Sequence, residues 1–127
     1  MDEQKKKNRT VLVVDDDDGI REAVRNVLEE EGCIVHTACN GREALDTLST
    51  IPRPCLILLD LMMPVMDGWE VMEALKADDA SAAIPVAVVS SLFSRDDYAA
   101  RFFRKPIALE TLIEVVRAHC GNGSDPA

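Results

Sequence analysis

The chain has 127 residues, enough for one domain with a single core and too few for two. Its hydrophobic content of 47% and charged content of 29% are typical of a soluble globular protein. The net charge of −9 disfavours nucleic acid or an anionic membrane as a direct partner. Because the sequence shows neither a signal peptide nor an apolar run that could cross a bilayer, we expect a cytoplasmic protein without membrane insertion.

Short apolar runs alternate with amphipathic segments along the chain. We expect residues 1–9 to be a basic tail and residues 121–127 to be a linker stub or a disordered tail. Strands are predicted at Val11–Val14, Ile34–Ala38, Cys55–Leu59, Val86–Val89 and Phe102–Phe103. Most of these runs are apolar on both faces, as strands of a parallel sheet covered on each side should be.

Amphipathic segments follow the strands. The first has one apolar helical face, made by Ile20, Ala23, Val24, Val27 and Leu28, and Gly32 provides its C-terminal stop. The other inward faces are predicted at Ala44, Leu45 and Leu48, at Val71, Met72 and Leu75, and at Leu109, Leu112, Ile113 and Val116. This alternation predicts a doubly wound α/β domain over residues 10–120, with one central five-stranded parallel sheet.

Acidic residues stand at the ends of two predicted strands. Asp15 and Asp16 follow the first strand, and Asp60 follows the third. In such folds the ligand lies outside the carboxyl ends of the strands, where we also expect Ser90 and Lys105. Three neighbouring carboxylates repel one another, so the cluster requires a cation or a raised pKa. The pattern therefore predicts a site for a hard divalent metal.

Three carboxylates, one hydroxyl and one ammonium at one rim suit phosphoryl transfer to an aspartate. Mg²⁺ prefers a few carboxylates together with phosphate oxygens and water, so we expect Asp16 and Asp60 to bind it directly and Asp15 through water. Asp60 would attack as a carboxylate, which is a recognised covalent nucleophile. Lys105 would neutralise one phosphoryl oxygen, and Ser90 would donate a hydrogen bond to another.

Several motifs occur in a fixed order, each at a predicted strand end. They are Val11–Asp17, Leu58–Gly68, Pro85–Ser90 and Arg104–Pro106. With these motifs, the chain from residue 10 to about residue 119 resembles the receiver domain of two-component response regulators. The resemblance implies a flavodoxin-like (CheY-like) fold.

The resemblance also implies roles for individual residues. Asp60 would accept phosphate from a histidine kinase or phosphotransfer protein, and an unknown downstream protein would read the result. The implied Mg²⁺ ligands are Asp15, Asp16, Asp60 and the backbone carbonyl of Met62. The implied switch residues are Ser90 and Phe102, and Lys105 would be the phosphate-binding lysine. Such a domain catalyses its own aspartyl phosphorylation and dephosphorylation without being a conventional enzyme.

One connection departs from the family pattern. Ser90 and Lys105 are fifteen positions apart, and only eleven residues separate Ser90 from Phe102. Since a parallel crossover with its helix needs at least ~10–12 residues, the fourth helix is expected to be one turn around Arg95–Ala100 or an irregular loop. This shortening motivates an alternative function, a pseudo-receiver that keeps the acidic pocket but signals by protein binding without phosphorylation.

Simpler interpretations exist for the same residues. Asp17 and Asp18 fit the N-terminus of a helix, where aspartate accepts from exposed N–H groups. Ser90 alone would be a strand-end hydroxyl, Lys105 alone a surface lysine, and Phe102 alone a packing residue. The bond before Pro106 is a candidate for the cis form. An Asp-x-Asp phosphatase is disfavoured because Asp60 lies 45 positions after Asp15, and nucleotide binding because no glycine-rich turn follows the first strand.

The four cysteines show no metal-binding spacing. Cys33, Cys39, Cys55 and Cys120 form no C-x-x-C pair, so a zinc site is not expected. Disulfides are rare in cytosolic proteins, and all four are therefore predicted to be small apolar packing residues.

Overall fold

The computed structural model describes residues 8–91 and 101–121. Its five strands are β1 (Thr10–Val14), β2 (Ile34–Ala38), β3 (Leu56–Leu59), β4 (Val86–Ser90) and β5 (Arg101–Arg104). Every pairing is parallel, and the sheet order is β2-β1-β3-β4-β5. The four helices of the described part are α2 (Asp18–Glu30), α3 (Gly41–Leu48), α4 (Gly68–Ala77) and α5 (Leu109–Cys120). The predicted fold class is confirmed; the short helical turn expected around residues 95–100 lies outside the described residues.

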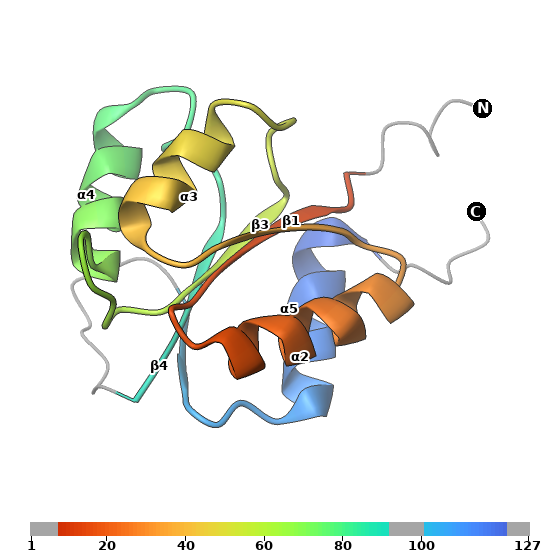
Figure 1. Ribbon diagram of the computed structural model, residues 1–127. Helices are drawn as coiled ribbons and strands as arrows, with labels where there is room; N and C mark the ends of the chain where they lie inside the picture. Colours follow the sequence, from red (N-terminus) through yellow and green to blue (C-terminus); the bar gives the residue numbers. More distant parts are fainter. Residues whose placement is uncertain (1–7, 92–100, 122–127) are drawn as a thin grey trace, which may run out of the picture.

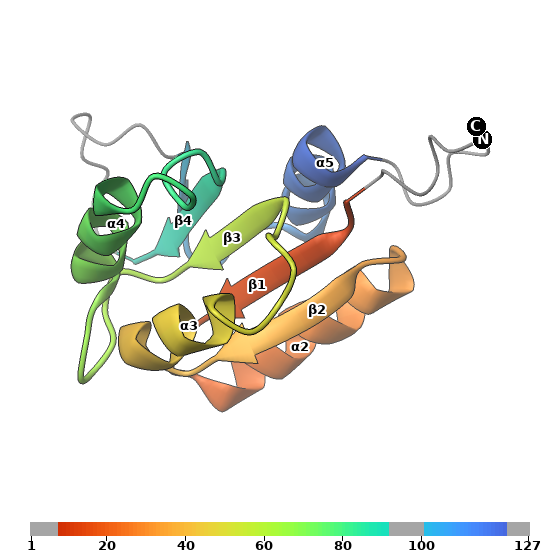
Figure 2. The same cartoon turned by 90° about the horizontal axis from the view of Figure 1, so that it is seen from above.

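Helices cover both faces of the sheet. Figure 1 shows α3 and α4 above it and α2 and α5 below it, and Figure 2 looks down on the strands from the α3 and α4 side. Each face has its own core cluster of buried apolar side chains. Because both faces are covered, every residue of β1 and β3 is buried. No helix among residues 8–91 and 101–121 has the length and apolar character that crossing a membrane requires.

The register of the strands brings their carboxyl ends to one rim. Val14 is aligned with Ala38 on one side and with Leu59 on the other. The sheet pairing continues for one further residue, because the N–H of Asp15 donates to Ala38 at 3.1 Å and that of Asp60 donates to Val14 at 3.0 Å. The two aspartates that follow β1 and β3 are therefore neighbours at the same level.

The loop after β3 returns closely past Asp60. The Gly68 N–H donates to the Leu61 carbonyl at 2.9 Å, and a Cβ at position 68 would overlap the Asp60 carbonyl oxygen. Only glycine fits such an approach. Asp67 then starts α4 with a capping box shared with Glu70. Val65 lies in the loop with a φ of 70°, a left-handed conformation that is unfavourable for a β-branched residue.

The prediction that all four cysteines are unpaired was wrong. Cys55 and Cys120 form a disulfide with a Cα–Cα distance of 5.4 Å, and Cys33 and Cys39 are free. Cys55 precedes β3 and Cys120 ends α5, so 65 positions of sequence separate two residues that the fold places together. Sequence spacing alone carries no information on such a pairing.

Two predicted helical faces are less buried than expected. In α2, Leu28 is buried, whereas Ile20 is 38% exposed. In α5, Leu109 is 52% exposed, while Val115 and Cys120 are buried instead. Both exposed residues belong to the first turn of their helix, which is the end that lies nearest the rim.

Candidate functional site

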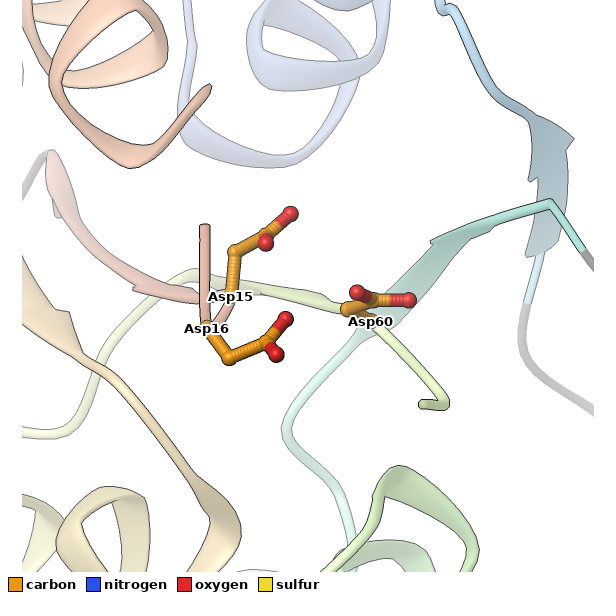
Figure 3. Close-up of side chains that lie close together, drawn as sticks. All are labelled: Asp15, Asp16 and Asp60. Carbon is orange, nitrogen blue, oxygen red and sulfur yellow. The ribbon is translucent and has the colours of Figure 1, made fainter. Parts of the chain in front are cut away.

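Three carboxylates meet at the rim of the sheet. Asp15 and Asp16 follow β1, and Asp60 follows β3; Figure 3 shows their side chains turned toward a common space. One ligand oxygen from each of the three residues lies within 4.8 Å of the others. Asp15 and Asp60 are buried, with 5% and 6% of their surface exposed, whereas Asp16 is exposed. The convergence predicted from the strand ends is therefore present.

Lys105 joins the two buried acids. Its Nζ lies 2.9 Å from Asp15 Oδ2 and 3.1 Å from Asp60 Oδ2. The lysine directly follows β5, and the Lys105–Pro106 peptide bond is cis. The Lys105 N–H also donates to the Ser90 carbonyl at 3.0 Å, which extends the pairing of β4 and β5. This backbone bond fixes the position from which the side chain reaches toward β3 and β1.

Burial and charge shift two pKa values at the site. Burial raises the pKa of Asp60 above its usual value; the Lys105 ammonium opposes this shift, and the Asp15 carboxylate adds to it. For Lys105, burial disfavours the charged form, but hydrogen bonds to Asp15 and Asp60 outweigh it and raise the pKa of the ammonium. The lysine therefore stays charged at neutral pH and holds the two carboxylates together.

The donor set fits a hard divalent cation. All three acidic side chains offer carboxylate oxygens, and Mg²⁺ prefers oxygen ligands. Among the described residues, three carboxylates meet one ammonium here, so negative charge is left over where two of the acids are buried. A divalent cation among them would relieve that repulsion. The residues present are thus suited to Mg²⁺.

The remaining predicted site residues lie in β4, in β5 and in the loop after β3. Ser90 ends β4, is fully buried, and is aligned with Arg104. Phe102 in β5 is half-buried and packs against the core cluster on the α3 and α4 side. The N–H of Met62 donates to Asp60 Oδ1 at 3.4 Å, and the Met62 side chain is 56% exposed.

Two supporting contacts were not foreseen from the sequence. Arg21 Nη1 donates to the Asp15 carbonyl at 2.8 Å, and the Asp17 N–H donates to Asp15 Oδ1 at 2.9 Å. Asp17 is also the N-cap of α2, as predicted, and accepts from the Ile20 N–H. These bonds fix Asp15 at the junction between β1 and α2. The sequence does contain a signal for the Arg21 contact: a basic residue in the second turn of the helix that follows the acidic pair.

Comparisons with known proteins agree with this geometry. Residues 11–117 match the family described as the response regulator receiver domain. The chain is 40% identical over 113 residues to response regulator MprA of Mycolicibacterium vanbaalenii, covering 85% of this chain and 48% of that protein. It is 32% identical to protein PilG of Pseudomonas aeruginosa over 92% of this chain and 91% of that one. The chain thus spans about half the length of MprA and nearly all of PilG.

Solved structures show the same architecture. The chemotaxis response regulator CheY4 of Vibrio cholerae superposes with a TM-score of 0.78 at 30% identity, over 87% of this chain and 98% of the other. The signal receiver domain of a signal transduction histidine kinase from Syntrophus aciditrophicus gives a TM-score of 0.79 at 31% identity, over 93% of both chains.

Proposed function

Because the chain belongs to the response regulator receiver domain family, we propose that it is a phosphorylation switch with Asp60 as the phosphoacceptor. The phosphoryl group would come from the phosphohistidine of a histidine kinase or phosphotransfer protein. The observation that carries this proposal is the bond of 3.1 Å between Lys105 Nζ and Asp60 Oδ2 at a buried strand end. This bond puts a cation beside Asp60. Asp60 follows the central strand β3, between Asp15 on one side and β4 and β5 on the other.

The transfer step follows from the environment of Asp60. A carboxylate oxygen of Asp60 attacks the phosphorus, a new O–P bond forms, and the N–P bond of the phosphohistidine breaks. The electron pair of that bond leaves with the imidazole. Lys105 is placed to shift its ammonium from the carboxylates to a phosphoryl oxygen, where it offsets the added negative charge. Burial of Asp60 keeps bulk water away from the reacting atoms.

The proposed Mg²⁺ ligands are Asp15, Asp16, Asp60 and the backbone carbonyl of Met62. When bound, Mg²⁺ supplies positive charge that offsets the charge developing on the phosphoryl oxygens. The chain's own contribution is to hold the acids in place. Arg21 and the Asp17 N–H fix the Asp15 backbone and carboxylate, and the Met62 N–H contacts Asp60.

We assign the switch to Ser90 and Phe102. Phosphorylation adds nearly two negative charges and three strong acceptors to Asp60. The Ser90 hydroxyl would then donate to a phosphoryl oxygen, and Phe102 would repack into the volume that Ser90 leaves. Such a change is a shift between two packed arrangements, and its size is set by how much better the phosphoryl group binds one of them. A downstream protein would bind the surface that changes.

Intact-mass measurement tests the phosphoacceptor. The protein is incubated with Mg²⁺ and acetyl phosphate, and we expect the mass of one phosphoryl group to be added. Asp60→Asn abolishes the addition, whereas Asp67→Asn, which alters a helix cap in the same loop, retains it. If no mass is added, or if the addition survives Asp60→Asn, the proposal is wrong.

A further inference from the structure

A large apolar cavity lies between the sheet and the pair α2 and α5. Its volume is about 460 Å³, within the range of small-molecule sites, which is roughly 300–1,000 Å³. Val13, Leu58 and Val89 form its floor on three neighbouring strands. The apolar face of α2 and the first turns of α5 form its walls. Most of the lining is therefore aliphatic.

The arrangement of the two helices explains why the space is open. Figure 1 shows α5 descending from the sheet, and Figure 2 shows the same helix nearly end-on, so α5 stands steeply against the sheet instead of lying along it. The far ends of the helices are joined, because Arg117 Nη2 in the last turn of α5 lies 3.0 Å from Glu31 Oε1 at the C-cap of α2. At its N-terminal end each helix exposes an apolar residue that lines the cavity, Ile20 in α2 and Leu109 in α5.

The open end of the cavity carries negative charge. Asp15, Asp60 and Lys105 belong to its lining, so two carboxylates and one ammonium stand beside an aliphatic space. The ammonium already bonds both acids, while in the described part of the chain Asp60 Oδ1 has a single, long contact of 3.4 Å with the Met62 N–H. Without Mg²⁺, a ligand with a negative group would have to draw the Lys105 ammonium away from Asp15 and Asp60. A ligand with a positive group would find a carboxylate oxygen to accept its hydrogen bond.

We propose that this cavity binds a small apolar cation, a molecule with an aryl or short alkyl body and a terminal amine. The body occupies the space over Val13 and Leu58, and the ammonium lies at the rim beside Asp60. The strands and the two helices enclose this space from three sides, which suits a small molecule better than a flat protein surface. The proposal concerns binding and does not depend on phosphorylation.

A pair of probes of opposite charge tests the proposal. The methyl resonances of Val13, Val24 and Leu58 are followed by NMR during titration with 4-phenylbutylamine or with 4-phenylbutyrate, in buffer free of divalent cations. We expect saturable shifts with the amine and binding at least about tenfold weaker with the carboxylate. Equal affinity for the two probes, or the absence of saturable shifts at millimolar amine, overturns the proposal.

Variants locate the binding. Ala23→Phe and Val24→Phe place an aromatic ring on the cavity wall and are expected to weaken amine binding by at least about tenfold. Ala118→Phe makes the same change at an exposed position of α5 outside the lining and is expected to bind like the parent protein. If both wall variants fold and still bind the amine as the parent does, the probe lies elsewhere and the cavity is not its site. Loss of phosphotransfer from a kinase in the wall variants without any amine binding would identify a protein-docking face and would also refute the proposal.

Discussion

The two halves of the site differ in how firmly the fold holds them. Asp15 and Asp60 extend β1 and β3, two central strands whose residues are all buried. Ser90, Phe102 and Lys105 come from β4 and β5, at one edge of the sheet, where Phe102 and Lys105 are only half-buried. In our proposal the acids are fixed by central strands whose residues are all buried, whereas Phe102, which must move, lies on a less buried edge strand.

The same contrast separates the two faces of the sheet. On the α3 and α4 side, the first residues of both helices, Gly41 and Gly68, are buried against neighbouring chain. On the α2 and α5 side, the first turns expose Ile20 and Leu109 around the cavity. Close packing fixes the positions of the residues that it surrounds, whereas an unfilled space leaves room for a ligand or for movement.

The largest expected effect on stability comes from truncating a side chain in the buried central strands. Leu59 in β3 is fully buried, so Leu59→Ala should lower the free energy of unfolding by about 2–5 kcal/mol through lost burial and a cavity. Phe102→Ala on the half-buried edge should cost less, although it removes a larger side chain. Urea unfolding of the two variants measures the difference. Equal losses, or a larger loss at Phe102, would contradict the contrast between central and edge strands.

The disulfide should contribute nearly as much to the free energy of unfolding. It ties the start of β3 to the end of α5 across 65 positions, so Cys120→Ala is expected to cost about 2–4 kcal/mol, mainly by releasing the unfolded chain. Cys33→Ala, at a buried cysteine without a disulfide, is the matched control for lost packing. Dithiothreitol should lower the melting temperature of the parent protein and of Cys33→Ala but leave Cys120→Ala unchanged. A parent protein insensitive to the reductant would disagree with this account.

Mg²⁺ should stabilise the half of the site that follows β1 and β3. Since the cation relieves repulsion among Asp15, Asp16 and Asp60, millimolar Mg²⁺ should raise thermal stability, by about 2.7 kcal/mol if its concentration reaches a hundred times Kd. Asp16→Asn should reduce the effect, and Asp46→Asn, at an exposed position of α3, should not. An unchanged melting temperature with Mg²⁺ would argue against a metal site.

Stability should depend on pH through Asp60. Burial raises the pKa of this carboxyl in the folded protein above its unfolded value, so the folded state holds the proton more strongly. Stability is therefore expected to fall as pH rises from the usual aspartate pKa through the raised one. Asp60→Asn should remove this fall, because asparagine does not titrate, and the variant should be more stable than the parent at neutral pH without metal. Melting temperatures of both proteins between pH 3 and pH 7 check this prediction. The same pH dependence in the two proteins would be evidence against a raised pKa of Asp60.

The smallest effect is expected in the loop after β3. Val65 has a φ of 70°, so Val65→Asn should raise stability by up to about 1 kcal/mol because asparagine tolerates the left-handed region better. Val65 is 79% exposed, and the change removes little packing. Denaturant unfolding measures the gain. A loss of stability would mean that this loop has another conformation in solution.

The sequence by itself determined the order of the elements and the identity of the acidic cluster. Continuous apolar runs predict buried parallel strands, and a polar residue that ends such a run must lie at the rim, so Asp15, Asp60 and Lys105 could be placed together before any coordinates. These inferences need only local periodicity and one rule about where strands end.

Tertiary structure alone decided the disulfide, the contacts of Arg21 and the separation of α2 from α5. Each depends on the angle and distance between elements that are remote in sequence, as Cys55 and Cys120 are, and local patterns contain no such information. The cavity has the same origin. Apolar periodicity predicts which face of a helix turns inward, but whether that face meets another side chain or an open space depends on how α5 is inclined to the sheet.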